Sequence, residues 1–176
     1  MVVFAGSIFS GLQAMKTETT ALESFAAPHG GPIGRVEEGR VEYAVAARHA
    51  LLPPPPPPRH PPALTARVAL VPMMIGDRGE LLDLARPTHD GVVVVAFGGG
   101  NIPPGAGAAV KRWLGEGKPV VLASRCLTGQ VTATYAFPGG GATLIREGVI
   151  PAGPRTPSQA RMELVISLSA GVEYGD

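Results

Sequence analysis

The sequence has few of the residues that mark several functional classes. It has one cysteine, Cys126, which rules out an internal disulfide and fits a reducing compartment such as the cytoplasm. Charged residues make up 16% and the formal net charge is +1, so the chain lacks the basic surface of a protein that binds nucleic acid or an acidic membrane. Aromatic residues make up 5%, too few for a platform that stacks single-stranded bases.

Long hydrophobic runs and metal-ligand spacings are also missing. No apolar stretch reaches the length of a membrane span. The apolar start, residues 1–9, lacks the basic residues of a signal peptide, and we interpret it as a buried strand. The histidines lie far apart without ligand spacing, so we expect no metal site; they are His29, His49, His60 and His89.

Glycine (24) and proline (19) are abundant and divide the chain. Six consecutive prolines at 53–58 predict a stiff polyproline II spacer, with an SH3 or WW ligand as the alternative interpretation. We therefore expect a first domain segment at 1–43, a proline-rich linker at 44–63 and a second domain at 64–176.

The second domain alternates strand and helix signals. Apolar runs at 68–72, 92–97 and 119–124 predict strands, and the middle run has the continuous β-branched pattern of a strand buried on both faces. Helices are expected before Pro87, after Pro103, around Leu144 and after Thr156, where Gln159 completes a capping box. This pattern predicts an α/β fold, with a small open parallel sheet covered by helices.

Ligands of such sheets bind at the C-terminal ends of the strands. Here that edge holds the glycine loop 98–101 and residues 124–126. The loop could cradle a phosphate, but the dinucleotide fingerprint fails at Pro103 and no Walker lysine follows, so a plain strand-to-helix turn stays open. Cys126 is either a nucleophile, with Arg125 favouring the thiolate, or a packing residue. Lys16 is a surface lysine or, if its pKa were depressed, a base.

Several stretches carry a family resemblance through their order along the chain. They are residues 3–20 with the Lys-Thr-Glu-Thr-Thr motif, 25–28, 31–34, 90–94, 98–103, 119–126, 148–153 and 156–161. Together they cover nearly all of the chain outside the linker, and in this order they resemble bacterial-type L-asparaginases of the asparaginase/glutaminase family. The first domain segment resembles the end of that family's N-terminal domain, and the second domain resembles its Rossmann-like C-terminal domain.

The resemblance implies an amidohydrolase that converts L-asparagine and water to L-aspartate and ammonia through a threonine-bound acyl-enzyme. It implies that Lys16 is the catalytic lysine, that Asn101 lies near the substrate, L-asparagine or L-glutamine, and that the protein forms a homo-oligomer. No metal or organic cofactor is expected. We also do not expect the protein to bind nucleic acid or membranes.

The chain also departs from the family. Nothing in it matches the segment that carries the nucleophilic threonine, so we expect an N-terminally truncated chain that is inactive by itself. Thr17, Thr19 and Thr20 belong to the lysine segment and are not expected to act as nucleophiles. The stretch 135–141 lacks the acid that reaches the neighbouring subunit's site in some members. The alternatives are a non-catalytic binding or oligomerisation module, a transfer-RNA-dependent amidotransferase subunit and a lysophospholipase-type amidohydrolase.

Overall fold

The computed structural model describes residues 1–44 and 63–175. The predicted linker, with its polyproline run, lies outside the described residues except at its two ends. The chain divides into two compact units, Met1–Pro61 and Pro62–Asp176, and each is described by itself.

The first unit consists of short antiparallel strands. Its larger sheet has the order β1-β2-β5-β6, and a second sheet pairs β3 with β4. Ile8, Phe9 and Ala27 are its buried hydrophobic residues. The strands are β1 (Val2–Phe4), β2 (Ser7–Phe9), β3 (Met15–Lys16), β4 (Phe25–Ala26), β5 (Gly34–Glu37) and β6 (Arg40–Tyr43).

The prediction of one buried strand at 1–9 was wrong. The segment folds back as a hairpin because Ala5 (φ 45°) and Gly6 (φ 73°) form a two-residue turn with positive φ at both positions. Such turns match the twist of paired strands. Only the second strand is buried: Ile8 is 2% exposed, whereas Val3 is 58% exposed.

The second unit is built on a four-stranded parallel sheet with the order β10-β9-β8-β7. This confirms the predicted α/β class. The strands are β7 (Val68–Pro72), β8 (Gly91–Ala96), β9 (Val120–Ser124) and β10 (Ile150–Pro151). Three of them coincide with the predicted runs to within one residue, while β10 was not predicted as a strand.

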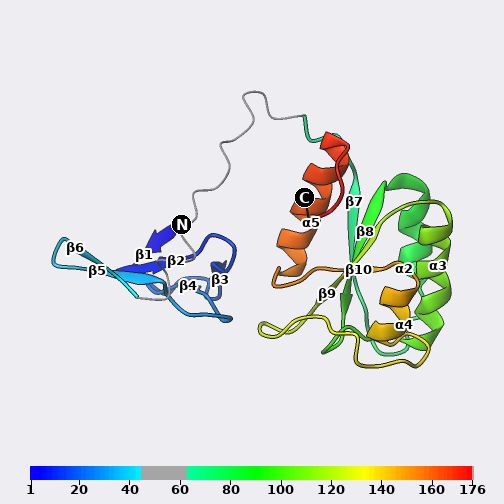
Figure 1. Ribbon diagram of the computed structural model, residues 1–176, viewed down its shortest axis with the longest axis horizontal. Helices are drawn as coiled ribbons and strands as arrows, with labels where there is room; N and C mark the ends of the chain where they lie inside the picture. Colours follow the sequence, from blue (N-terminus) through cyan, green and yellow to red (C-terminus); the bar gives the residue numbers. More distant parts are fainter. Residues whose placement is uncertain (45–62, 176) are drawn as a thin grey trace. The chain divides into compact units, whose positions relative to one another are not determined.

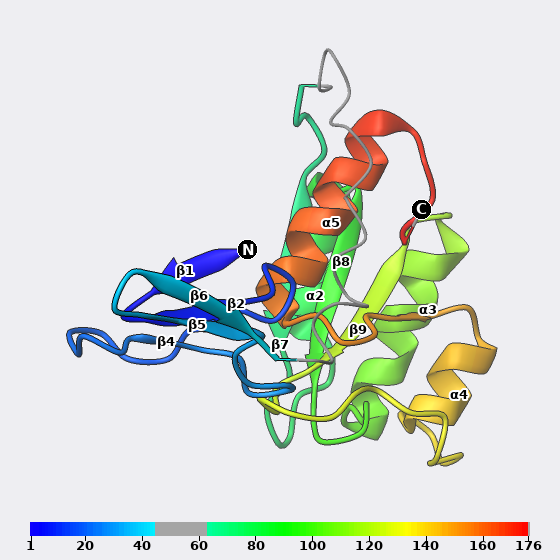
Figure 2. The ribbon, with the colours of Figure 1, turned by 60° about the vertical axis from the view of Figure 1, so that its left-hand side comes forward.

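Helices cover both faces of this sheet (Figure 1). Val92 and Val94 of β8 pack with Leu82, Trp113 and Leu144 from the helices on one face. On the other face, Val93 packs with Leu164 and Val165 of α5 (Figure 2). The helices are α2 (Glu80–Ala85), η1 (Arg86–Thr88), η2 (Pro104–Ala106), α3 (Gly107–Gly115), α4 (Gly141–Arg146) and α5 (Pro157–Ala170).

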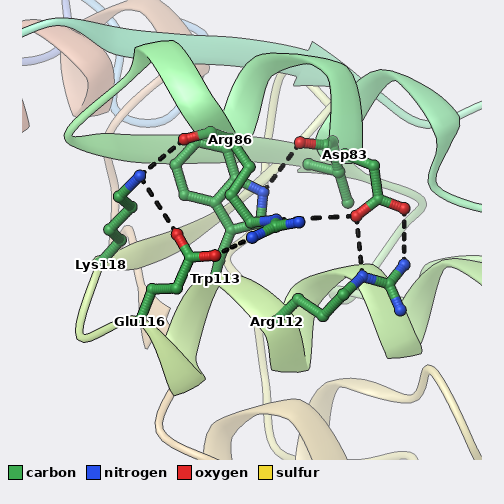
Figure 3. Close-up of polar contacts among 7 residues, drawn as sticks. Asp83, Arg86, Arg112, Trp113, Glu116 and Lys118 are labelled. Carbon is green, nitrogen blue, oxygen red and sulfur yellow. Dashed lines mark hydrogen bonds and ion pairs between the residues drawn. The ribbon is translucent and has the colours of Figure 1, made fainter.

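The indole of Trp113 joins α3 to α2. Its side chain is fully buried, and its Nε1–H donates a hydrogen bond to the carbonyl oxygen of Leu82 (3.0 Å; Figure 3). The ammonium of Lys118 lies 5.7 Å from the centre of the indole ring. A large apolar side chain and a satisfied polar atom therefore fix the two helices together.

Ion pairs surround this contact (Figure 3). Arg112 donates two hydrogen bonds to the carboxylate of Asp83 (2.8 and 2.6 Å), and these hold the pKa of Asp83 below its usual value. Arg86 pairs with Glu116, and Lys118 donates to the carbonyl oxygen of Arg86 (2.6 Å). The network links α2 and η1 to α3 and the turn that follows it.

The predicted capping box of the last helix is confirmed. The hydroxyl oxygen of Thr156 accepts a hydrogen bond from the backbone N–H of Gln159 (3.3 Å). In return, Gln159 Oε1 accepts from the backbone N–H of Thr156 (2.9 Å). Pro157 occupies the first helical position, where a missing N–H costs nothing.

We expect Thr156→Ala to lower the free energy of unfolding by about 1 kcal/mol, because the backbone N–H of Gln159 loses the hydroxyl oxygen that accepts its hydrogen bond. Urea unfolding followed by circular dichroism measures the change. Thr156→Ser is the matched control, since it keeps the hydroxyl and should stay within a few tenths of a kcal/mol of the native chain. Equal losses in both variants would contradict the capping explanation.

Candidate functional site

The glycine loop follows β8 at the C-terminal edge of the parallel sheet. Phe97 and Asn101 close it through two backbone hydrogen bonds, from Phe97 N–H to Asn101 O (2.8 Å) and from Asn101 N–H to Phe97 O (3.0 Å). Gly98 (φ 46°) and Gly100 (φ 110°) supply the left-handed backbone that this turn requires. The turn therefore fixes the backbone position from which the Asn101 side chain extends.

The end of β9 is tied to the same loop. The hydroxyl of Ser124 donates to Gly98 O (2.6 Å) and accepts from the backbone N–H of Cys126 (3.1 Å). The backbone N–H of Arg125 donates to Ala96 O (3.0 Å). The prediction that residues 98–101 and 124–126 share one edge is confirmed.

Residues 131–141, called the strap here, pack directly on the glycine loop. Thr132 N–H donates to Gly99 O (2.9 Å), and Ile102 N–H donates to Gly139 O (2.8 Å). The approach is close enough that a Cβ added to Gly100 of the loop would lie 2.7 Å from Val131 Cγ1 of the strap. The strap and the loop therefore form one surface at this edge.

The strap also orients Asn101. The backbone N–H of Gly141 donates to Asn101 Oδ1 (3.4 Å), so the Nδ2 amide hydrogens are the ones left to donate to a ligand. The side chain is half-buried. This arrangement suits a residue that offers hydrogen bonds to an acceptor, and the substrate-binding role of Asn101 stays a prediction.

The neighbouring residues Arg125 and Cys126 differ in their contacts. The guanidinium of Arg125 lies 4.7 Å from the centre of the Phe97 ring, in a cation–π contact. The thiol of Cys126 is free and exposed, and in the part of the chain that the structure describes it has no histidine partner. Arg125 was weighed from the sequence only as a neighbour of Cys126. No sequence pattern signals its contact with Phe97, which lies 28 positions earlier.

Lys16 lies in the first unit, on β3, opposite Phe25 of β4. Its Nζ is exposed and lies 5.5 Å from the centre of the Phe25 ring. The neighbouring Glu18 carboxylate accepts a hydrogen bond from the backbone N–H of Thr19 (2.6 Å), which holds the pKa of Glu18 below its usual value. Burial and a nearby cation are the two features that make a lysine a base, and the contacts described in this unit supply neither. Lys16 and Asn101 belong to different units.

Two hollows in the second unit are lined by other residues. One, of about 390 Å³, lies between α3, α4 and the strap residues 136–139, and the other, of about 490 Å³, is lined mainly by apolar residues of α5 and the chain after it. Neither is lined by Asn101 or Arg125. Within residues 1–44 and 63–175, no three histidine, cysteine or acidic side chains gather as metal ligands, and no helix has the length and apolarity to cross a membrane.

Comparison with known proteins accounts for both units. The family model of the N-terminal asparaginase domain matches residues 1–48, and that of the Glutaminase/Asparaginase C-terminal domain matches residues 67–175. The probable L-asparaginase of Deinococcus radiodurans is 35% identical over all 176 residues, which correspond to 53% of its own length.

Two further relatives match all or part of the chain. The L-asparaginase of Bacillus licheniformis is 26% identical over 97% of this chain and 51% of its own length. One subunit of the glutamyl-tRNA(Gln) amidotransferase of Pyrococcus furiosus is 35% identical over 58% of this chain and 23% of its own length. The chain thus spans about half the length of the asparaginases it matches. From the order of the two domain matches and the fold of the second unit, the chain belongs to the asparaginase/glutaminase family.

Proposed function

We propose that this chain serves an amidohydrolase that converts L-asparagine, or L-glutamine, to the acid and ammonia. The observation that carries the proposal is the ordered match of an N-terminal and a C-terminal asparaginase domain along one chain, with 35% identity to a probable L-asparaginase. The proposal includes a homo-oligomer in the cytoplasm and no cofactor. Its domains are residues 1–43 and 64–176, joined by the linker 44–63.

In this proposal Lys16 takes part in proton transfer and Asn101 contacts the substrate. Both roles require another protein surface that covers these two residues. Lys16 is exposed in its own unit, and Asn101 is half-buried and lines neither of the two hollows described above. A covering surface would exclude water around Lys16 and bring it next to the reacting groups.

The nucleophile is the part that these 176 residues do not provide. No stretch matches the family's nucleophilic threonine segment, and Thr17 is held in place by its backbone hydrogen bond to Ser24 O (2.9 Å) within the lysine segment. We therefore propose that the chain alone does not hydrolyse asparagine. The alternative is a non-catalytic binding or oligomerisation module, and the two closed hydrophobic clusters of the second unit support a unit that is stable by itself.

A fusion separates these two proposals. The chain is joined behind the N-terminal half of the Deinococcus radiodurans relative, and ammonia release from L-asparagine is measured for the fusion and for the 176-residue chain. We expect release from the fusion alone. Lys16→Ala in the fusion should lower kcat by about 10²–10⁴-fold, the usual range for loss of a proton-transfer group.

Lys111→Ala is the matched control, because Lys111 is an exposed lysine of the other unit that pairs with Glu147 (2.9 Å). It should leave kcat unchanged. A folded fusion that releases no ammonia would favour the non-catalytic module. Release by the 176-residue chain alone would show that a different nucleophile, or two copies of the chain, complete a site.

A further inference from the structure

The parallel sheet of the second unit ends at β7 on one side and at β10 on the other, and each has one side without a neighbouring strand in the described part of the chain. The free N–H and C=O groups on such a side can pair with a strand of another molecule. β7 is the longer of the two, and its five residues, Val-Ala-Leu-Val-Pro, carry no charge. The side chain of Leu70 is 39% exposed. The outer edge of β7 therefore has the length and the apolar character that favour the addition of a strand.

The register of β7 shows which of its backbone groups face this outer edge. The N–H of Met73 donates a hydrogen bond to Val95 O of β8 (3.0 Å), and every second residue before Met73 faces β8 in the same way. The residues between them direct their backbone groups outward, and these are Val68, Leu70 and Pro72. An added strand would pair with β7 through these three residues.

Side chains of α5 occupy the N-terminal half of this outer edge. Arg161 Nε donates a hydrogen bond to Val68 O (2.9 Å), and both residues are at least partly buried. Just before the strand, the backbone N–H of Ala66 donates to the hydroxyl oxygen of Ser169 (3.1 Å). The position from which an added strand would donate to Val68 O is therefore already taken. An approaching strand would have to displace a charged side chain, which is a common protection of edge strands.

A proline occupies the C-terminal half of the same edge. Pro72 faces outward and has no N–H, so an added strand finds no donor at this position. The other edge strand, β10, has the same feature in only two residues. Pro151 faces outward there, because the N–H of the next residue, Ala152, donates to Leu122 O of β9 (3.0 Å). Each edge strand thus has a proline at an outward-facing position. Among the outward-facing residues of β7, only Leu70 has both an N–H and a C=O without a partner in the described residues.

We propose that Arg161 and Pro72 together prevent the outer edge of β7 from pairing with the same edge of a second copy. Two β7 edges can meet antiparallel about a twofold axis, with the Leu70 residues of the two copies exchanging both of their N–H···O hydrogen bonds. In that register Val68 of one copy lies opposite Pro72 of the other, where its carbonyl oxygen meets no N–H. The same carbonyl oxygen already accepts from Arg161. The two residues therefore act on one hydrogen bond, and either of them is sufficient to prevent it. The proposal is independent of the proposed function, because no residue of that reaction takes part.

The test is a double variant of the 176-residue chain, Pro72→Val with Arg161→Ala, which restores the missing N–H and frees Val68 O. Sedimentation velocity measures association, and hydrogen exchange followed by NMR measures pairing at the Leu70 amide. In the native chain we expect the Leu70 N–H to exchange at one rate at all protein concentrations. In the double variant its exchange should slow by about tenfold or more as the concentration rises, with a matching increase in mass. Each single variant should stay within about twofold of the native chain, because the two residues act on one hydrogen bond and their effects are not additive.

Two further variants control the result. Arg161→Lys combined with Pro72→Val keeps an ammonium that can donate to Val68 O, so it should behave like Pro72→Val alone. Trp113→Phe weakens the packing on the opposite face of the sheet and leaves the β7 edge unchanged, so it reports any association that arises from partial unfolding. Circular dichroism establishes that the variants are folded. If the alanine variant does not fold, Arg161→Met takes its place, because methionine keeps the packing of the side-chain stem without its donors.

Three results would overturn the proposal. Slower exchange at Leu70 with rising concentration of the native chain would show that the edge is already open to pairing. Native mass and native exchange in the folded double variant would show that neither residue keeps the edge unpaired. Equal slowing in Trp113→Phe would assign the association to partial unfolding. The homo-oligomer of the proposed function is distinguished from edge pairing, because a complex formed through another surface raises the mass without slowing exchange at Leu70.

Discussion

Replacing Trp113 by alanine is expected to lower the free energy of unfolding of the second unit by about 3–5 kcal/mol, the usual cost of emptying a large aromatic site in a core. Trp113 is fully buried between α3 and α2. Its loss also removes one of the two hydrogen bonds that the carbonyl oxygen of Leu82 accepts, the one from the indole N–H at 3.0 Å, and leaves the one from the backbone N–H of Arg86. A domain of this size has a total stability of about 5–15 kcal/mol, so the variant should be close to unfolding at 37 °C.

Urea unfolding followed by circular dichroism measures this effect, because Trp113 is the one tryptophan of the chain and its fluorescence is lost with it. Trp113→Phe is the matched control. It keeps most of the apolar volume but loses the N–H donor, so its loss should be about 1–3 kcal/mol. A change below 1 kcal/mol in the alanine variant would mean that the surrounding helices close the space, and that Trp113 does not hold α2 on α3.

Gly100→Ala should cost roughly 2–4 kcal/mol and displace the candidate site. The backbone of Gly100 has a φ of 110°, which side chains with a Cβ avoid. An added Cβ would also lie 2.7 Å from Val131 Cγ1, so the strap would have to move. Because Asn101 is the next residue, its amide should lose its hydrogen bond from Gly141.

The matched control for this prediction is Gly98→Ala in the same turn. Gly98 has a φ of 46°, and no atom lies within 4 Å of its added Cβ, so the cost should be about 1 kcal/mol. Thermal unfolding gives the two stabilities, and the NMR shift of the Asn101 side-chain amide reports the displacement. If the two variants were equally stable, contact with the strap would not be what fixes the loop.

The sequence predicts the structure of a segment correctly where that segment has a distinctive residue pattern of its own. The β-branched run around Val94 predicts a strand because only a strand buried on both faces suits it, and the Thr156 capping box marks a helix start to the residue. The edge that holds Asn101 followed from the predicted parallel sheet, because parallel strands end on the same side.

Features made by tertiary contact could not be predicted in this way. The strand β10 has two residues, too few for any periodic pattern, and it exists because Ile150 pairs with Val121. The cation–π contact between Arg125 and Phe97 joins residues from two strand ends, and neither segment has a sequence pattern that predicts it. The roles expected of Lys16 and Asn101 came from resemblance, because neither residue has a local pattern that indicates chemistry.

The single helix on one face of the sheet has a consequence for synthesis on the ribosome. Val68, Val93, Val121 and Ala123 lie on that face, and the helical residues that cover them, Ala160, Leu164 and Val165, belong to α5. The opposite face is covered by α2, α3 and α4, which are made earlier. During translation the nascent chain can therefore close one side of its core while the other stays open to water and to chaperones. Closure of the domain waits until α5 has left the exit tunnel.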